Sequence, residues 1–379
     1  MLYIPAPFKR FFIPRVRLKS LLPHSNGLVV ISYLTSPFRD ESACAGARGH
    51  TNWQECRAMV EAWRETGYDV EVISATDQRY SPPPDAFALI DIHSNLERWQ
   101  NHPAPVKILH ATGAHWLTQN RAELERLESL RDRRGVSLIP RRIAPPCRGA
   151  ETADMITYLG NDFTSGSFRF AQKPMRRIPL SSAYEFAFPE DKDWEAARRN
   201  FLWMGSFGMV HKGLDLVLEA FAATPDLHLT VCGRPEKEAD FFEAYRRELT
   251  SLPNIHLAGW TDPASPEFQT LRKSHGFAIY PSCSEGGGGS LIHCMHAGLV
   301  PVATREASVD LGEAGLLILE GSVPEVVRSI QEAASLDPTV LKDRAAETWK
   351  QVRANHTLAN FKIRYAEFVL NLCQVHSTT

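Results

Sequence analysis

Short apolar runs alternate with amphipathic segments along most of the chain. The first apolar run covers residues 28–34, a helical pattern covers 51–65, and a second apolar run covers 70–73. Continuous apolar runs of this length are typical of parallel strands buried on both faces, so the order predicts a βαβ unit. Further elements of this first array are predicted as strands at 86–93, 106–110, 154–160 and 176–180, and as a charged helix at 120–134.

The same alternation restarts after a polar segment. Residues 181–200 are rich in charge, contain Pro189 and predict a linker that runs into a short helix. The second array then has predicted strands at 201–205, 227–233, 255–259, 276–280 and 300–303, and predicted helices at 213–223, 240–251 and 290–297. Two βαβ arrays joined by a linker predict an α/β protein with two Rossmann-like, doubly wound domains that face each other across a cleft. We place these domains at residues 1–185 and 186–357.

Composition narrows the class of protein. The 42 basic and 44 acidic residues give a net charge of −2, which argues against a globally basic nucleic-acid binder. The seven cysteines form no C-x-x-C pair, so neither a disulfide framework nor a structural zinc site is expected, and the cytoplasm is the expected location. Apolar runs stay shorter than 18 residues, which argues against a membrane-spanning helix.

The N-terminal segment, residues 1–24, is basic and apolar at once. It has no acidic residue, and its basic residues are Lys9, Arg10, Arg15, Arg17 and Lys19. One interpretation is an arm that attracts anionic lipid headgroups and gives peripheral contact with the inner face of a membrane. The other is an irregular segment packed on the first domain with a solvated basic face, which four interspersed prolines favour.

The segment from residue 280 to 291 carries the strongest indication of a site. A buried strand ends at Tyr280, Glu285 is followed by four glycines, and a helix is predicted to begin at Ser290. Open α/β sheets bind ligands beyond the carboxyl ends of their strands, and glycines let the backbone approach a ligand closely. Free amides at the helix start suit a phosphate or a sugar hydroxyl, which Glu285 could also contact. The alternative is a flexible loop with a solvated acid.

Lys212 is predicted to lie at the same edge of the sheet. It follows the strand at 201–205 and directly precedes the helix at 213–223. An ammonium group at this edge could neutralise a diphosphate bound at the glycine turn. Taken alone, a lysine beside a helix start is more commonly a surface charge.

The order of these motifs resembles the retaining GT-B glycosyltransferases of family 4. The motifs that carry the resemblance are Lys212-Gly213, Cys232-Gly233, the run from Ile255 to Trp260, the run from Tyr280 to Gly286, and the run from Met295 to Val302. The similarity is clearest over about residues 201–318. The resemblance implies transfer of a sugar from a nucleotide-sugar, UDP- or GDP-linked, to a hydroxyl of a glycan, lipid-linked or other acceptor, with retention of anomeric configuration and without a required metal. Polysaccharide biosynthesis is a common role of such enzymes.

The resemblance also implies roles for residues. Lys212 would contact the donor diphosphate and Glu285 the donor sugar, in the C-terminal domain. The backbone of the following segment would assist Glu285, and this segment comprises Gly286, Gly287, Gly288, Gly289 and Ser290. The acceptor would bind mainly to the N-terminal domain, onto which the last helix, at about 358–379, would pack back.

Two positions depart from the family pattern. His293 stands where the family usually has a second glutamate for the nucleotide ribose, and an imidazole cannot supply a bidentate carboxylate. The family often has an arginine about five positions before the lysine, but residues 206–208 contain none. Arg234, predicted at the end of the strand at 227–233, is a candidate for the missing positive charge.

Two histidines are predicted at strand ends in the N-terminal domain. His110 is the catalytic candidate, because related enzymes often have a histidine at a similar place, near the donor sugar and acceptor. His93 is a second candidate, and either histidine could instead satisfy backbone groups at its strand end. Gly46 and Gly49, in the loop at 35–49, are expected to border the cleft.

Several patterns carry less weight. His293 and His296 have a spacing compatible with metal, but no cysteine or acidic motif joins them. A basic stretch could meet an anionic acceptor but is interpreted as a solvated face, and its residues are Arg131, Arg133, Arg134, Arg141, Arg142 and Arg148. A non-catalytic nucleotide or sugar binder and a nucleotide-sugar epimerase remain alternatives. A dehydrogenase is disfavoured because no G-x-G-x-x-G follows the first strand.

Overall fold

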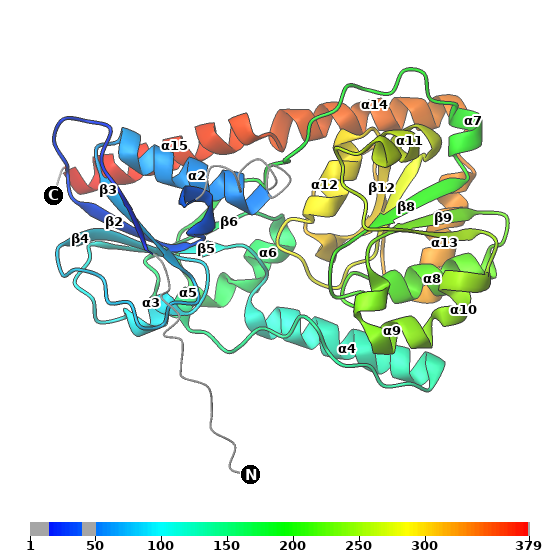
Figure 1. Cartoon of the computed structure of the whole chain (residues 1–379), viewed down its shortest axis with the longest axis horizontal. Helices are drawn as coiled ribbons and strands as arrows, with labels where there is room; N and C mark the ends of the chain where they lie inside the picture. The colour runs from blue at the N-terminus through cyan, green and yellow to red at the C-terminus, as the bar shows by residue number, and fades with distance from the viewer. Residues whose placement is uncertain (1–14, 40–50, 378–379) are drawn as a thin grey trace, which may run out of the picture.

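The chain forms two α/β halves that lie side by side (Figure 1). The computed structural model describes residues 15–39 and 51–377. The N-terminal half has a seven-stranded sheet and the C-terminal half a six-stranded sheet, as the two βαβ arrays predicted. The predicted fold class, two Rossmann-like units, is confirmed. The predicted boundary between residues 185 and 186 stays a prediction.

The sheet of the N-terminal half has the order β1-β3-β2-β4-β5-β6-β7. Its strands are β1 (Val16–Leu18), β2 (Leu28–Tyr33), β3 (Asp69–Ser74), β4 (Ala86–Asp91), β5 (Val106–Ala111), β6 (Met155–Tyr158) and β7 (Met175–Arg177). All pairs are parallel except β1 with β3. Every residue of β2 is buried, because this strand lies inside the sheet and both of its faces are covered.

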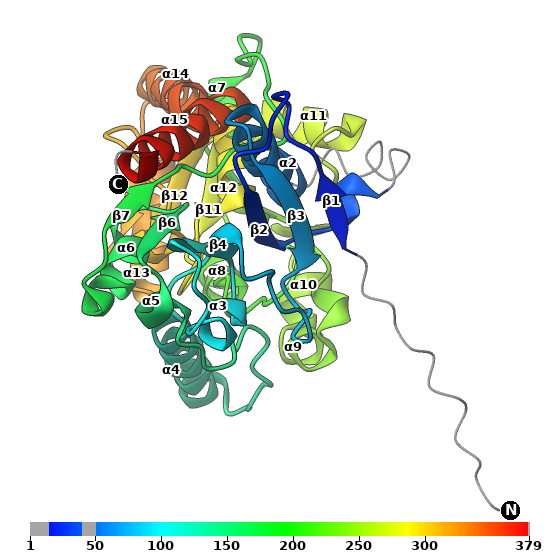
Figure 2. The ribbon, with the colours of Figure 1, turned by 90° about the vertical axis from the view of Figure 1, so that its left-hand side faces the viewer.

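Helices cover both faces of this sheet (Figures 1 and 2). On one face lie α2 (Thr51–Glu65) and α15 (Leu358–Ser377), and on the other lie α3 (Asn95–Arg98) and α5 (Gly149–Thr152). The remaining helical segments of this half are η1 (Ser36–Phe38), α4 (Trp116–Arg134), α6 (Asp162–Ser167) and η2 (Arg169–Ala171). The last helix therefore packs back on the N-terminal half, and Lys362 forms an ion pair with Glu61 of α2 there (3.0 Å).

The sheet of the C-terminal half is parallel throughout and has the order β10-β9-β8-β11-β12-β13. Its strands are β8 (Asn200–Met204), β9 (His228–Cys232), β10 (Ile255–Gly259), β11 (Phe277–Tyr280), β12 (Val300–Thr304) and β13 (Leu316–Ile318). Its helices are α7 (Trp194–Ala197), α8 (Leu214–Ala223), α9 (Ala239–Ala244), α10 (Arg246–Ser251), α11 (Pro266–Ser274), α12 (Gly289–His296), α13 (Val323–Ala334) and α14 (Pro338–Asn355). Two 3-10 turns, η3 (Pro235–Lys237) and η4 (Arg305–Ala307), complete it.

The helix predicted at 240–251 is wrong in one respect, because the structure divides it into α9 and α10. The break is at Tyr245, whose backbone has a φ of −118°. The Tyr245 ring is fully buried and stacks on Phe241 at 4.8 Å between ring centroids. Burial of this ring in the core outweighs the helical pattern of the surrounding charged residues.

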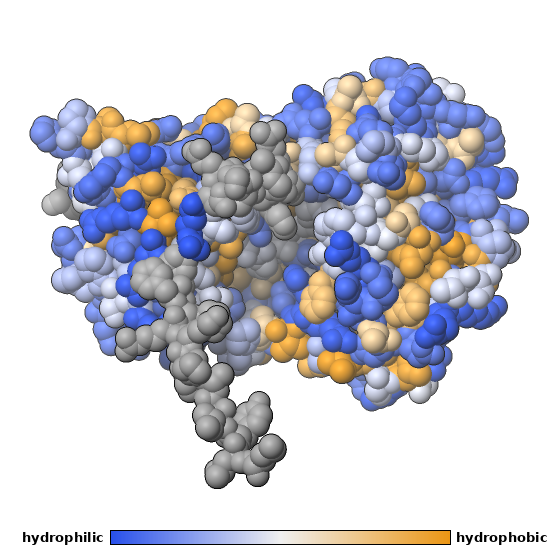
Figure 3. All heavy atoms as spheres, in the orientation of Figure 1, coloured by the Kyte–Doolittle hydropathy of each residue, from blue (hydrophilic) through white to orange (hydrophobic). Residues whose placement is uncertain are grey.

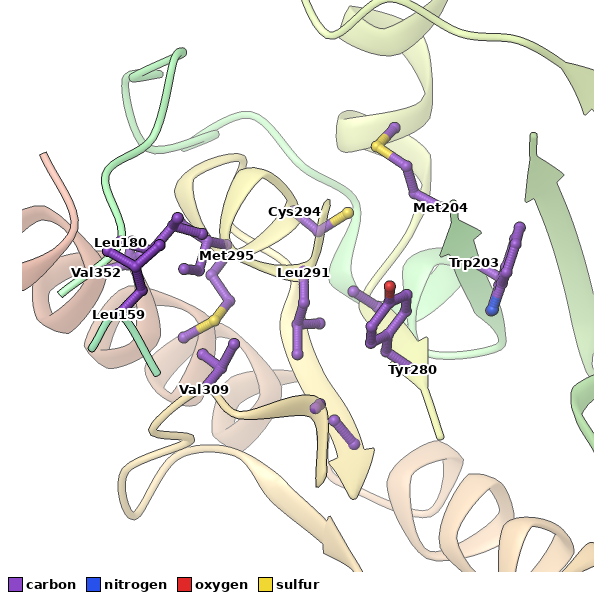
Figure 4. Packing of buried hydrophobic residues seen from close by; sticks show 14 of the residues in the cluster. Leu159, Leu180, Trp203, Met204, Tyr280, Leu291, Cys294, Met295, Val309 and Val352 are labelled. Carbon is purple, nitrogen blue, oxygen red and sulfur yellow. The ribbon is translucent and has the colours of Figure 1, made fainter. Parts of the chain in front are cut away.

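One hydrophobic core runs through both halves. Figure 4 shows Leu159 and Leu180, from the N-terminal half, near Met295 and Val309 of the C-terminal half, and all four belong to one buried cluster. Apolar packing between the halves therefore holds them together beside the cleft. Within the described ranges, no helix combines the length and apolar character needed to cross a bilayer.

The described part of the basic N-terminal segment packs on the first sheet. Arg15 forms an ion pair with Asp77 (3.3 Å), and Lys19 forms one with Asp69 (2.9 Å). The hydrogen bond from Lys19 lowers the pKa of Asp69. These contacts agree with the interpretation of a segment packed on the domain. Lys9 and Arg10 lie outside the described residues, as do Gly46 and Gly49, and membrane contact stays a prediction.

We predict that Glu55 makes stability depend on pH. Its carboxyl group is fully buried in α2, and burial raises its pKa to about 8 although the Ser181 amide donates a hydrogen bond to it (2.7 Å). The group is therefore neutral in the folded chain but ionised near pH 4.5 when unfolded. The free energy of unfolding should fall as pH rises from 4.5 to 8.

Glu55→Gln removes this dependence. The free energy of unfolding of the variant should exceed that of the wild type by on the order of 3 kcal/mol at pH 7 and should equal it at pH 4. Chemical denaturation across this pH range measures the difference. Glu61→Gln, on the exposed side of the same helix, is the control. Parallel pH profiles for wild type and Glu55→Gln would contradict the prediction.

Candidate active site

A cavity of about 500 Å³ lies between the two halves. Its walls come from segments that follow β4, β5, β8 and β11, at the carboxyl ends of these parallel strands. The lining residues with polar groups are His93, Thr112, His115, Gln119, Arg141, Arg142, Ser284 and Glu285. The surface hollow between the halves is visible in Figure 3. This is the place where open α/β sheets bind their ligands.

Lys212 and Glu285 meet beside this cavity, as the sequence predicted, and Glu285 is the member of the pair that lines it. Lys212 precedes α8, and its Nζ lies 2.5 Å from Oε1 of Glu285. The same Nζ donates a hydrogen bond to the Tyr280 hydroxyl (2.9 Å), which in turn donates to Glu285 (3.1 Å). The Lys212 and Glu285 side chains are only 8% and 11% exposed, so this ion pair is shielded from water. Lys212, Tyr280 and Glu285 thus form one hydrogen-bonded cluster between the end of β11 and the start of α8.

The surroundings of Glu285 keep its carboxylate ionised. Burial alone would raise its pKa, but the positive charges of Lys212, His211 and Arg142 lower it to about 2. For His211 burial acts in the opposite direction and would lower the pKa, but hydrogen bonds to Cys283 and Glu123 raise it to about 9. The site is therefore a buried region in which positive charge gathers around one carboxylate.

The glycine turn after Glu285 has little room for side chains. A Cβ on Gly286 would lie 1.9 Å from the carbonyl oxygen of Thr112, in the other half. Gly288 has a φ of +54°, which disfavours other residues, and a Cβ there would lie 2.6 Å from Val309. Gly288 is the N-cap of α12 and offers no side-chain cap, so the first amides of the helix are not bound by a capping side chain.

The rest of the predicted turn borders the linker. Cβ atoms on Gly287 and Gly289 would contact Leu180 at 3.1 and 3.4 Å, and Ser290 is the second residue of α12. The helix begins one residue earlier than predicted, at Gly289. Gly286 is the member of the turn that lines the cavity.

His293 and Arg234 lie away from the cavity lining. The Nε2 atom of His293 accepts a hydrogen bond from the Ala183 amide (3.4 Å), and the ring lies edge-on to Tyr184. Burial lowers the pKa of His293 to about 4, so its ring is neutral. Arg234 is exposed and lies over the ring of Trp260 at 5.2 Å. Donor binding by these two residues stays a prediction.

His110 does not line the cavity. Its predicted place at the end of a strand is also wrong. Strand β5 continues to Ala111, so His110 lies inside the strand and its ring is fully buried near Tyr33 and Tyr365. Its Nδ1 lies 2.8 Å from the hydroxyl of Thr157, and burial lowers its pKa to about 4. In this position His110 is a core residue.

The cavity instead has His93 and His115 in its walls. Sequence reasoning named His93 as the second candidate and missed His115. His115 is the N-cap residue of α4, is 7% exposed, and its Nε2 is buried without a hydrogen-bond partner among the described residues. The available indication was Gly113, which ends the apolar run of β5 and places the next histidine in a loop.

The helix α4 belongs to the N-terminal half but lies along the C-terminal half (Figure 1). Arg133 forms an ion pair with Asp215 (2.8 Å), Arg134 forms one with Glu248 (2.8 Å), and Arg141 pairs with Asp240. These residues were interpreted as part of a solvated basic face, and for these three that interpretation is wrong. They have acidic partners in the other half, which the sequence pattern could not show.

Three tryptophans of the chain lie in different surroundings. Trp203 is a core residue, Trp116 lines the cavity and Trp260 is 56% exposed. Within the described ranges, no group of three or more histidine, cysteine or acidic side chains has an arrangement that could hold a metal ion. That catalysis needs no metal stays a prediction.

Comparison with known proteins identifies the C-terminal half. Residues 198–335 match the sequence model of the family described as glycosyl transferases group 1. The matched family consists of glycosyltransferases, and the match covers just over a third of the chain. The matched segment contains all strands of the second sheet together with Lys212, Glu285 and the glycine turn. Among curated proteins, no sequence matches this chain.

Solved structures show the fold of the whole chain. HepE from Anabaena, in complex with UDP and glucose, is 11% identical, covers 91% of this chain and 100% of its own, and gives a TM-score of 0.57. Sucrose-phosphate synthase from Thermosynechococcus elongatus is 15% identical, with coverages of 92% and 99% and a TM-score of 0.62. An E. coli trehalose-6-phosphate structure bound with UDP-2-fluoro glucose is 8% identical, with coverages of 91% and 98% and a TM-score of 0.57. These similarities establish the GT-B fold.

Proposed function

We propose that this protein is a glycosyltransferase that transfers a sugar from a UDP-sugar to a hydroxyl of a glycan or lipid-linked acceptor, with retention of anomeric configuration. The observation that carries the proposal is the Lys212–Tyr280–Glu285 cluster beside the glycine turn, at the wall of a cavity between the halves. HepE in complex with UDP and glucose, and the E. coli structure with UDP-2-fluoro glucose, support a uridine donor.

The proposed roles follow from charge. As the bond between sugar and diphosphate breaks, negative charge grows on the departing phosphate oxygens. The Lys212 ammonium and the amides of residues 286–290 stabilise that charge, and they do so strongly because the site is shielded from water. Glu285, ionised and acceptor-only, receives hydrogen bonds from hydroxyls of the donor sugar and orients it.

The acceptor is proposed to enter from the N-terminal half. His93 and His115 line this side of the cavity, together with the apolar groups of Trp116 and Ile143. Glu285 is the sole carboxylate among the described residues that line the cavity, and it is paired with Lys212. This arrangement supports attack by the acceptor hydroxyl on the face that the diphosphate leaves, without a covalent intermediate on a carboxylate.

The donor assignment is tested by thermal shift with UDP, GDP, ADP and their glucose conjugates. UDP and UDP-glucose should raise the melting temperature of the wild type, because a ligand that binds the folded state stabilises it. Lys212→Ala should reduce that shift by at least half, since the ammonium that faces the diphosphate is lost. Lys342→Ala, which removes an exposed lysine of α14, should retain the full shift.

Other outcomes would redirect the proposal. A UDP shift that survives Lys212→Ala undiminished would contradict the placement of the diphosphate. Saturable nucleotide binding without transfer or hydrolysis of any nucleotide-sugar would favour a non-catalytic binder, and release of a free epimerised sugar would favour an epimerase. Proton NMR of the first product formed distinguishes retention from inversion by the coupling constant of the anomeric proton.

A further inference from the structure

Arg142 belongs to the loop at residues 135–148, which connects α4 to α5. Its amide donates hydrogen bonds to both carboxylate oxygens of Glu123 (2.9 Å each), and its carbonyl accepts one from Gln119 (2.5 Å). Both partners lie on α4. The backbone of Arg142 is therefore fixed to this helix, and α4 is in turn fixed to the C-terminal half by its ion pairs.

The Arg142 side chain crosses to the C-terminal half. Its Cγ lies 2.6 Å from the position that a Cβ on Gly208 would take, and Gly208 has a φ of +82°. Gly208 lies in the loop between β8 and Lys212, and its amide donates to the buried carboxyl of Glu238 (2.6 Å). A glycine in a fixed loop thus leaves the space in which Arg142 passes from one half to the other.

The guanidinium group of Arg142 has no acidic partner within ion-pair distance among the described residues. Its neighbours Arg133, Arg134 and Arg141 each have an acidic partner, whereas Arg142 forms no ion pair with any described residue. Its Nε is buried without a hydrogen-bond partner among those residues. The side chain lines the same cavity as Glu285, and its charge helps to lower the pKa of that carboxyl.

Charge balance at the site leaves a need for a further cation. Glu285, at 2.5 Å, offsets part of the charge that Lys212 presents to a ligand. The other cation near Glu285, His211, has an acidic neighbour of its own in Glu123 at 3.7 Å. A nucleoside diphosphate brings at least two negative charges. An arginine suits this task because its planar fork of N–H donors matches two oxygens of a phosphate.

We propose that Arg142 binds the diphosphate of the donor from the N-terminal half, so that both halves contribute a cation to one anion site. This inference rests on the proposed function and names a residue that the sequence motifs did not. Its consequence is that the anion site is complete only while α4 lies against the C-terminal half. Separation of the halves would remove one cation and favour release of the nucleotide product.

Isothermal titration calorimetry with UDP and UMP tests the inference on the full chain. We expect Arg142→Gln to weaken UDP binding at least about tenfold and to reduce the preference for UDP over UMP. Arg142→Lys keeps the positive charge but loses the paired N–H donors of the guanidinium. Its affinity for UDP should therefore lie between those of Arg142→Gln and the wild type. Arg305→Gln, which removes an exposed ion pair between the halves outside the cavity, should bind UDP like the wild type.

Salt dependence separates a charge contact from a structural role. The slope of log Kd for UDP against log salt should be shallower in Arg142→Gln and restored in Arg142→Lys. UDP affinity of Arg142→Gln within twofold of the wild type, in a variant with an unchanged melting temperature, would overturn the inference alone. A wild type that binds neither UDP nor UDP-glucose would overturn the proposed function, and this inference with it.

Discussion

Replacement of Glu285 by glutamine is expected to lower kcat at least about a hundredfold while UDP binds as well as before or more tightly. The amide has nearly the same shape, but it removes the negative charge that holds Lys212 and Tyr280 at 2.5 and 3.1 Å. Orientation of the donor sugar is lost, whereas the freed ammonium gains attraction for the diphosphate. Initial rates and calorimetric UDP titration measure the two effects separately, and Glu320→Gln, at an exposed acid outside the cavity, is the control.

The same variant should change the acid stability of the chain. The pKa of Glu285 is about 2 in the folded chain and lies near 4.5 when unfolded. Its ionised form therefore contributes stability above pH 4.5, and this contribution is lost as pH falls toward 2. The difference in free energy of unfolding between wild type and Glu285→Gln should shrink across that window. A pH-independent difference, or weaker UDP binding together with unchanged kcat, would contradict the role given to Glu285.

Gly286→Ala is expected to lower activity about a hundredfold by a different route. The added methyl group would lie 1.9 Å from the carbonyl oxygen of Thr112 and 2.7 Å from the Cα of Gly113, both in backbone of the other half. Backbone cannot yield as a flexible side chain does, so the halves must separate locally. A displacement of about 1 Å between donor and acceptor groups is enough to cost this much in rate.

Initial rates and small-angle X-ray scattering test this prediction together. The maximum dimension of Gly286→Ala should exceed that of the wild type, with an unchanged circular dichroism spectrum. Gly166→Ala, in α6 where a Cβ would have no neighbour within 4 Å, should match the wild type in both measurements. Wild-type rates in Gly286→Ala would show that the contact between the glycine turn and Thr112 is dispensable.

Much of the fold and the core of the candidate site could be predicted from local sequence. Buried parallel strands read as continuous apolar runs, so most strands were located, and the rule that ligands bind at strand ends brought Lys212 and Glu285 together. The elements that were not predicted are the strands β1 and β13, the helices α11, α13 and α14, and the short helices α3, α5 and α6. Strand β1 is only three residues long and alternates with basic residues at 15, 17 and 19 rather than forming an apolar run. Ion pairs to Asp69 and Asp77 hold it at the sheet edge.

The contributions of the N-terminal half to the site were beyond local sequence. His110 is excluded from the cavity because β5 continues to Ala111, and His115 reaches the cavity because it lies in the loop that begins α4. Arg142 looked like one of several basic residues in a solvated stretch. Its place at the cavity follows from the docking of α4 on acids more than 80 positions away in the chain, such as Asp215.

The position of α15 bears on how the chain folds during its synthesis. Phe361, Tyr365 and Val369 are almost completely buried, and α15 packs beside α2 on a sheet whose strands leave the ribosome hundreds of residues earlier. The half that is translated first thus lacks one of its covering helices until residues 358–377 have been translated. We expect the C-terminal half to reach its native packing earlier, and the nascent N-terminal half to depend on chaperones for longer.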